Sequence, residues 1–326
     1  MRIISGLTLA AFGSIGLLTA CGGGSLSSTG AVPAAITPAQ QKFEKPAPAQ
    51  APNDLYVVEY DFVNHCDCAN VDILNSHYKS IGSITNGIGQ FIGSGALDAA
   101  GNLYVANARP ASVVEYAPGQ WNAPSFTYTA DMVVPSAVTA DSNGNVYEAD
   151  SQSYAVNEYA QGKNSVVASC SSTSDESPSG VAVDSNGDVF VAILKDQILD
   201  FWEYQGGLGA SCAPKVLPVS GQISARGLLP TVLALDKYRN LVVATGYEVA
   251  VIDAPDYTSV SRTIGSGFFS PIGVSLNRKN TRAYVADSQN ETVTVVNYST
   301  GTNVKVLGYS GEYEPISAVS SLDAVY

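Results

Sequence analysis

The sequence predicts an all-β fold, a β-propeller of six four-stranded antiparallel blades. One phrase, made of a proline-led apolar strand, an acidic turn and a second apolar strand, occurs six times in the 326-residue chain. Its copies start at residues 92, 135, 178, 230, 271 and 315, so that successive starts lie 43, 43, 52, 41 and 44 residues apart. A period near 43 residues that carries four short strands is typical of one propeller blade.

The first two strands of each repeat flank the acidic turn. The turn residue falls six positions after the start of the phrase in five copies, as Asp98, Asp141, Asp184, Asp236 and Asn277. Second strands are expected over 103–106, 146–149, 189–192, 241–244 and 283–286. We interpret the turn as a hairpin in which the acidic residue caps the backbone and glycine or asparagine supplies a positive φ. A calcium loop of the EF-hand type is disfavoured, because its glycine stands at the sixth position and here it stands at the fourth.

The third strand ends in an acidic-aromatic pair, at Glu115-Tyr116, Glu158-Tyr159 and Glu203-Tyr204. Because these pairs recur at the blade period, we expect the rings to pack between neighbouring blades and the acids to face solvent. A more polar fourth strand follows, for example at 125–129 and 165–169. The repeat that starts at 178 carries nine extra residues before residue 230, and an inserted loop on a repeat scaffold is a common place for specificity.

The two ends of the repeat region complement each other. Residues 53–57 read as a second strand that lacks a first strand, whereas residues 315–320 read as a first strand that lacks the rest of its blade. Pairing of these N- and C-terminal strands would complete the sixth blade and close the ring. Closure removes the free sheet edges that promote aggregation.

The blade pattern resembles NHL repeats, in which a proline and an apolar strand precede an Asp-x-x-Gly-Asn turn and a Tyr-Val-Ala-Asp strand. The nearest matches are residues 180–184 (GVAVD) and 283–288 (AYVADS), and the resemblance covers residues 53–326. It implies the propeller fold and says little about function.

The N-terminus has the composition of an export signal. Residues 1–20 contain one early arginine and an apolar run too short to span a bilayer comfortably. Residues 18–21 (LTAC) resemble the lipobox of bacterial lipoproteins, which implies cleavage before Cys21 and lipidation of that cysteine. Two or three acyl chains would give a stable anchor on the extracytoplasmic side of the cell envelope. By the same resemblance, Gly22 permits sorting to the outer membrane in a Gram-negative host. A plain secretory signal is the alternative.

Residues 21–52 are rich in Gly, Ser, Ala and Pro and have few bulky apolar side chains. We expect a flexible tether of about 30 Å average reach, with the propeller over residues 53–326. The formal net charge is −13 and basic residues form no block, which disfavours nucleic-acid binding.

Four cysteines follow Cys21, at Cys66, Cys68, Cys170 and Cys212. In an exported chain we expect disulfides, with three possible connectivities. A bond between Cys66 and Cys68 would be strained, so we expect each of them to pair with a distant cysteine. Soft-metal binding by residues 65–68 (HCDC) is a weaker alternative, because oxidation competes for the thiols.

Function is expected at one mouth of the central channel, where loops between second and third strands meet loops that precede first strands. The candidate ligand face comprises Asn107, Arg109, Asp150, Gln152, Asp196, Tyr247, Asp287 and Gln289. Serines and a threonine near the start of the first strands would lie at its rim: Ser94, Ser136, Ser179, Thr231 and Ser317. No catalytic constellation is recognisable, so the sequence favours a binding scaffold for a protein or an envelope glycan, without a cofactor.

Two enzyme families with related propellers provide the alternatives. Virginiamycin B lyases have similar repeats but need a histidine in a later blade, whereas His65 and His77 both lie near the start. Gluconolactonase-like propellers hold a divalent cation on the channel axis with Asn, Asp and Glu side chains. Asn107, Asp150 and Asp287 occupy matching places, although residues 193 and 245 break the pattern. A calcium-dependent lactonase or esterase is therefore the alternative function.

Overall fold

The computed structural model describes residues 54–61, 68–209, 211–225, 233–308 and 313–320. The predicted export signal, Cys21 and the tether lie outside these residues, and so do Cys66 and Thr231. Among the residues described, no helix is long and apolar enough to cross a membrane.

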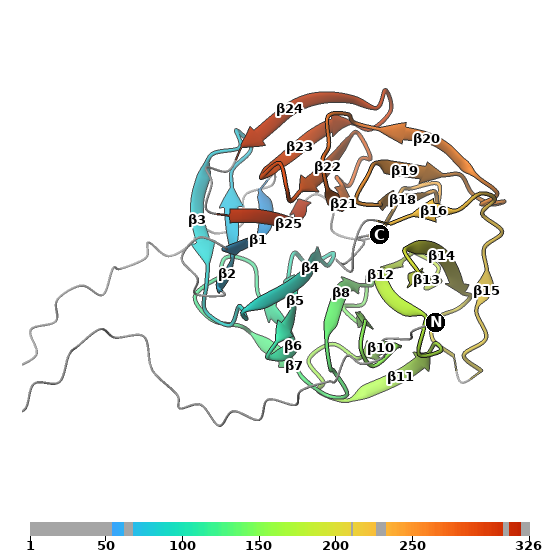
Figure 1. Cartoon of the computed structure of the whole chain (residues 1–326). Coiled ribbons are helices and arrows are strands. Elements are labelled where there is room, and N and C mark those ends of the chain that lie inside the picture. Colours follow the sequence, from blue (N-terminus) through green and yellow to red (C-terminus); the bar gives the residue numbers. More distant parts are fainter. Residues whose placement is uncertain (1–53, 62–67, 210, 226–232, 309–312, 321–326) are drawn as a thin grey trace, which may run out of the picture. The chain divides into compact units, whose positions relative to one another are not determined.

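Six antiparallel sheets surround a central channel, which confirms the predicted six-bladed propeller (Figure 1). Blade 1 consists of β25 (Tyr313–Ser320), β1 (Leu55–Asp61), β2 (Cys68–Leu74) and β3 (Ser80–Ile84). Blade 2 consists of β4 (Phe91–Leu97), β5 (Leu103–Arg109), β6 (Ala111–Tyr116) and β7 (Phe126–Tyr128). Blade 3 consists of β8 (Pro135–Ala140), β9 (Val146–Asp150), β10 (Ala155–Tyr159) and β11 (Val166–Ser171).

Blade 4 consists of β12 (Ser177–Val183), β13 (Val189–Lys195), β14 (Ile198–Tyr204), β15 (Lys215–Val216) and β16 (Ile223–Ser224). Blade 5 consists of β17 (Leu233–Leu235), β18 (Leu241–Ala244), β19 (Val249–Ile252) and β20 (Val260–Ile264). Blade 6 consists of β21 (Pro271–Leu276), β22 (Arg282–Asp287), β23 (Thr292–Asn297) and β24 (Thr302–Gly308). The first strand of every blade is the innermost one.

The ring closes as the sequence predicts. Strand β25 pairs antiparallel with β1, in a register that runs from Leu55 opposite Ser320 to Asp61 opposite Tyr313. Blade 1 is thus assembled from both ends of the propeller sequence. Its inner strand β25 follows β24 of blade 6 along the chain, whereas β1, β2 and β3 come from the N-terminal end of the propeller. The hydrogen bonds between β25 and β1 therefore join the two ends of the propeller sequence.

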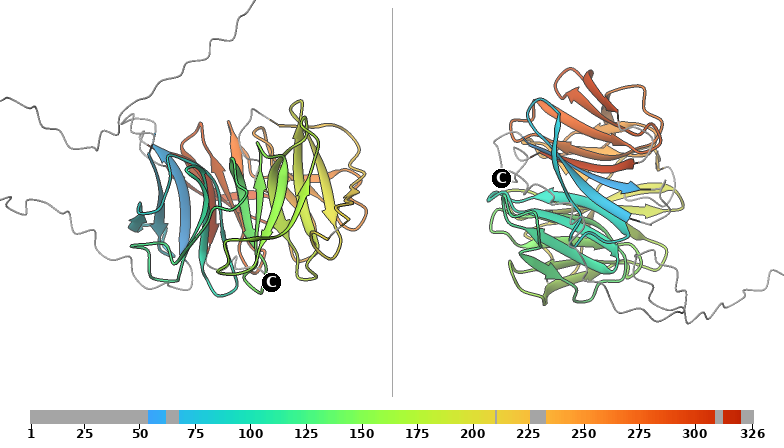
Figure 2. Two further views of the ribbon diagram at one scale, coloured as in Figure 1. Left: turned by 90° about the horizontal axis from the view of Figure 1, so that it is seen from below. Right: turned by 90° about the vertical axis from the view of Figure 1, so that its left-hand side faces the viewer.

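The antiparallel order gives the ring two different faces, and Figure 2 shows the strands running across its thickness. Each inner strand begins at the loop face, which we define by the loops that enter the blades and the turns between second and third strands. Each inner strand ends at the turn face, which carries the acidic turns between first and second strands.

The acidic turns are hairpin caps, as expected. Oδ1 of Asp141 accepts the backbone N–H groups of Asn143 and Asn145, both at 2.8 Å, and Oδ2 accepts the side-chain amide of Asn145 at 2.9 Å. Gly144 has a φ of +81°, a conformation that glycine adopts without strain. Asp184 and Asp236 bind backbone N–H groups at the same two positions of their turns.

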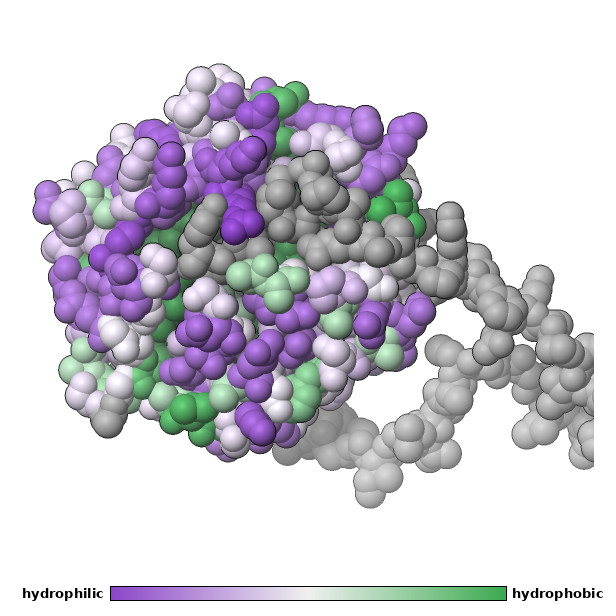
Figure 3. Space-filling view, turned by 180° about the vertical axis from the view of Figure 1, so that it is seen from behind, coloured by the Kyte–Doolittle hydropathy of each residue, from purple (hydrophilic) through white to green (hydrophobic). Residues whose placement is uncertain are grey.

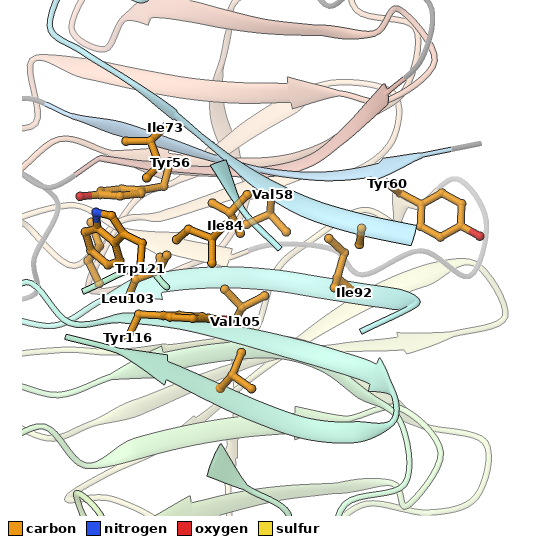
Figure 4. Packing of buried hydrophobic residues seen from close by; sticks show 14 of the residues in the cluster. Tyr56, Val58, Tyr60, Ile73, Ile84, Ile92, Leu103, Val105, Tyr116 and Trp121 are labelled. Carbon is orange, nitrogen blue, oxygen red and sulfur yellow. The ribbon is translucent and has the colours of Figure 1, made fainter. Parts of the chain in front are cut away.

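The core lies between the blades. In Figure 4 the side chains of blades 1 and 2 interdigitate, with the Tyr56 and Trp121 rings edge to face at 5.4 Å between centroids. Tyr116, Tyr159 and Tyr204 are buried, which confirms the predicted packing of the aromatic pair positions.

The acids of those pairs do not all face solvent, and this part of the prediction was wrong. Glu115 is buried and accepts a hydrogen bond from the Tyr128 hydroxyl at 3.0 Å. Glu203 is 3% exposed and lies 2.9 Å from Nη2 of Arg239, which comes from the acidic turn of blade 5. Each carboxylate has a fixed partner on another strand or on the next blade, and this partner compensates for its burial.

Arg239 links blade 4 to blade 5 through three carboxylates. Besides Glu203, its guanidinium lies 2.8 Å from Asp184 and 2.6 Å from Asp188. Arg239 adopts a φ of +71° at the turn position where blades 2, 3 and 4 have glycine. This backbone conformation is unfavourable for arginine, and the ion pairs across the interface offset its cost.

A disulfide joins Cys170 and Cys212, with 5.2 Å between their Cα atoms. The expectation that Cys66 and Cys68 each pair with a distant cysteine was therefore wrong. Cys170 lies on the outer strand β11, and Cys212 belongs to the insertion of the next blade, 42 residues along the chain. Because the two cysteines lie about one blade period apart, they belong to neighbouring blades and meet at the outer edge of the ring.

The insertion in blade 4 packs against the ring. It forms β15 and β16, which both pair with β14 and share the outer position of the blade. Leu217, Ile223 and Ala225 are buried in the cluster between blades 4 and 5. The extra residues therefore enlarge the core between these blades.

Glu148 is the most unusual core residue. Five blades have valine at its place in the second strand: Val57, Val105, Val191, Val243 and Val285. Glu148 is 0% exposed, and its Oε2 accepts a hydrogen bond of 3.0 Å from Asn157 on the paired strand. Burial, with a contribution from the charge of Asp150, raises the pKa of this carboxyl well above its ordinary value.

We predict that replacing Glu148 and Asn157 together by valine will stabilise the fold at alkaline pH. The pair would then match Val105 and Val114 of blade 2. Because the pKa of Glu148 is raised in the folded state, this residue makes its full contribution to the free energy of unfolding below the unfolded-state pKa of about 4.3. The contribution is lost as the pH rises towards the folded-state pKa. The expected gain is about 1–3 kcal/mol at pH 8, measured by urea unfolding.

The control is Glu176→Gln, because the Thr173 hydroxyl lowers the pKa of Glu176 and the sign of its pH effect is reversed. The difference between double variant and wild type should grow from pH 5 to pH 9. A difference that stays constant over this range would show that Glu148 does not titrate with unfolding.

Candidate ligand-binding faces

Three of the predicted site residues serve as clamps at the loop face. Asp150 is 0% exposed and accepts the backbone N–H groups of Val133 and Val134 at 2.5–3.1 Å from the loop that enters its blade. It also accepts those of Gln152 and Ser153 in its own turn, at 2.9 and 2.8 Å. Both carboxylate oxygens are therefore occupied by main-chain donors.

Asp287 and Asn107 act in the same way in blades 6 and 2. The carboxylate of Asp287 accepts the backbone N–H groups of Phe269 and Ser270 at 2.8 and 2.7 Å. Oδ1 of Asn107 accepts the N–H of Gly89 at 2.9 Å, and its amide donates to the carbonyl of Gly87 at 3.0 Å. In blade 5, Thr245 occupies this place and accepts the N–H groups of its own turn. The shared position thus fixes loop conformation, and the three side chains do not converge on one ligand.

The other candidates lie at the turns between second and third strands. Arg109, Gln152, Asp196 and Gln289 are exposed, and Tyr247 is 56% exposed. The rim serines Ser94, Ser136 and Ser179 are buried and bond to main chain, whereas the hydroxyl of the buried Ser317 has no hydrogen-bond partner among the described residues. Ser94 accepts the N–H of Val138 at 3.0 Å, and Ser136 donates to the carbonyls of Ala149 and Pro178 at 2.8 and 3.1 Å. These hydroxyls connect inner strands of neighbouring blades.

Exposed hydrophobic side chains also gather on the loop face, which the sequence reasoning missed. They come from four blades: Phe91 (38% exposed), Val133 (50%), Tyr247 (56%) and Phe269 (52%). The signal was present in part, since Val133 and Phe269 each stand two residues before the proline that opens a first strand. The guanidinium of Arg109 lies 5.3 Å from the centroid of the Phe91 ring, which also stacks on Tyr60 at 5.3 Å.

Figure 3 shows the hydropathy of the side of the ring opposite to that in Figure 1. Hydrophilic side chains predominate in that view, and hydrophobic ones are scattered among them (Figure 3).

The central channel contains a cavity of about 690 Å³. Inner strands of blades 2 to 6 form its wall, and the acidic turns of blades 4, 5 and 6 contribute to its lining. Lys237, Arg278 and Lys279 belong to these turns. This basic rim was not among the site residues predicted from the sequence, which all belong to the loop face.

Metal ligands do not cluster in the part of the chain that the structure describes, where no group of three or more His, Cys, Asp or Glu side chains is placed to hold an ion. Asp150 and Asp287, the carboxylates of the metal alternative, already accept main-chain hydrogen bonds through both oxygens.

No family model and no curated protein matches this chain in sequence. Solved structures match in fold. A chain of a nidogen/laminin complex superposes with a TM-score of 0.62 at 12% identity, over 84% of this chain and 99% of that one. A protein of unknown function from Bacteroides caccae gives 0.59 at 12% identity, over 83% and 99% of the two chains. The WD40 propeller domain of Doa1 gives 0.55 at 12% identity, over 85% and 87%. These likenesses show the propeller fold alone.

We predict that Asp150→Ala will lower the free energy of unfolding by about 2–4 kcal/mol, because buried main-chain donors lose their acceptor. Denaturant unfolding of this variant would be compared with Gln152→Ala, an exposed neighbour whose replacement should change stability by less than about 0.5 kcal/mol. If Asp150 were instead a calcium ligand, the loss of stability would appear only with calcium present and would vanish in EDTA.

Proposed function

We propose that this chain is a lipid-anchored binding scaffold of the bacterial cell envelope, with an NHL-like propeller that binds a protein partner through its loop face. The observation that carries the proposal is the set of exposed hydrophobic side chains from four blades on that face, Phe91, Val133, Tyr247 and Phe269. They stand on loops that buried clamps hold in place.

The composition of the loop face supports a protein partner. Aromatic residues and arginine dominate the energetics of protein interfaces, where they act as rigid anchors. The stack of Tyr60, Phe91 and Arg109 is already formed, so little side-chain entropy remains to be lost on binding. Around it, the exposed polar residues Gln152, Asp196 and Gln289 suit the hydrated rim of an interface.

The fold relatives support the same class of function. One belongs to a nidogen/laminin complex, and the other named relative is a WD40 propeller. An envelope glycan is the other ligand class that the sequence allows, and the experiment below separates the two. The calcium-dependent lactonase has no comparable support, because Asp150 and Asp287 are engaged by main-chain donors.

The lipid anchor and the tether complete the proposal. Lipidated Cys21 would hold the chain at an outer membrane, if the host has one, and residues 21–52 would allow the propeller to reach a partner about 30 Å away. The ring is closed and rigid, so the flexible tether alone adapts to the partner. The tether limits the partner's distance from the membrane more than the direction in which the partner lies.

The loop-face hypothesis predicts that Val133→Ser combined with Phe269→Ser will weaken partner binding at least tenfold. Photo-crosslinking from position 133 on intact cells would identify the partner, and the dissociation constant would then be measured with both purified proteins. Val167→Ser is a matched control, because Val167 is 60% exposed on the outer strand β11. Equal losses in both variants, or a partner that is a glycan and not a protein, would contradict the proposal.

The anchor hypothesis predicts that Cys21→Ser will move the protein from the membrane fraction to the soluble extracytoplasmic fraction. Fractionation and metabolic labelling with a fatty-acid analogue would check this. The variant Cys212→Ser, which removes one partner of the disulfide with Cys170, controls for general effects of cysteine loss and should remain labelled. Labelling that persists in Cys21→Ser would show that another residue carries the lipid.

A further inference from the structure

The basic residues at the channel rim are concentrated on one side. The middle of the acidic turn is uncharged in blades 2, 3 and 4, where it reads AAG, SNG and SNG. In blades 5 and 6 the same positions carry Lys237, Arg239, Arg278 and Lys279. A chain with 16 Lys and Arg residues and a net charge of −13 thus places four cations in two adjacent turns.

Two described acids of this region, Asp184 and Asp236, already have partners. Asp184 is paired with Arg239 at 2.8 Å, and Asp236 caps its own turn and accepts the Tyr298 hydroxyl at 2.9 Å. Arg239 is in turn neutralised by its three carboxylates. Lys237 and Lys279 are exposed, and neither forms an ion pair with another described residue. The positive potential of the rim therefore comes mainly from side chains that are not compensated.

The two basic turns are locked together. The backbone N–H of Lys237 in blade 5 donates to Oδ1 of Asn280 in blade 6 at 2.7 Å. On its other side, the blade 5 turn is tied to blade 4 through Arg239. Lys237 and Lys279 consequently lie on a prearranged surface, which lowers the entropic cost of gathering them around one ligand.

The channel adds polar groups behind this rim. Each inner strand pairs with a neighbour on one side only, as the strand orders show, and its other edge faces the channel. Such an edge presents backbone N–H and C=O groups. With a volume of about 690 Å³, the cavity has the size of a small-molecule site.

We propose that the turn-face mouth of the central channel binds a small polyanion, a molecule with two or more carboxylate or phosphate groups. The charged groups would contact Lys237, Arg278 and Lys279, and the remaining polar atoms would face the edges of the inner strands. This site lies on the face opposite to the proposed protein interface, so it is independent of that function. The scaffold would then carry both a protein and a small anionic ligand.

The test is calorimetric titration of the full chain with pyrophosphate and with citrate at low ionic strength, and with glycerol as an uncharged probe. We expect binding of at least one anion, no binding of glycerol, and a fall in affinity as salt is added. Binding of pyrophosphate alone assigns a phosphate ligand, and binding of citrate alone assigns a carboxylate ligand. No binding of either anion at millimolar concentration would overturn the proposal.

Matched variants locate the site. Lys237→Gln with Lys279→Gln should raise the dissociation constant at least tenfold. Both side chains are exposed, so we expect the double variant to fold, and its unfolding midpoint checks this directly. Lys163→Gln with Lys305→Gln removes the same charge outside the cavity lining and should change the constant less than twofold. Equal weakening in both double variants would show that net charge, and not this mouth, governs binding.

Discussion

The pairing of β1 with β25 is the contact on which the rest of the structure depends. Each blade buries its hydrophobic surface against the next, so an open array would leave two unpaired faces and two unprotected ends. Closure through a shared blade removes both, because residues 55–61 and 313–320 come from opposite ends of the propeller sequence. It also makes the ring one cooperative unit, since blade 1 cannot form until the last repeat has been reached.

In the closed ring, polar side chains make several of the contacts that fix neighbouring blades relative to each other. Apolar packing alone specifies that blades adjoin, but it allows them to slide. Arg239 with its three carboxylates, Ser136 bonded to Pro178 and Asn280 bonded to Lys237 each fix one blade relative to another through directional contacts. The buried Glu148 instead bonds to Asn157 within blade 3, and its valine counterparts show that the fold does not require it.

Much of the fold was predictable because the repeat is local. Strand order, the capping role of Asp141 and the pairing that completes blade 1 all follow from patterns within about forty residues or from the two ends of the repeat region. The partners of Cys170, Glu115 and Glu203 were not predictable in this way. These partners depend on which side chains lie opposite each other across a strand pair or a blade interface. An insertion such as the one in blade 4 changes which side chains are in contact there.

The candidate site shows the same division. Asn107, Asp150 and Asp287 stand at equivalent positions of their blades, but equivalent positions in a closed repeat are separated around the ring. Each side chain therefore solves a local problem, the anchoring of its own entry loop. Function in such a molecule has to arise where the repeat is broken. The hydrophobic residues of the loop face and the basic turns of blades 5 and 6 are two places where neighbouring blades differ, and both lie on faces of the closed ring.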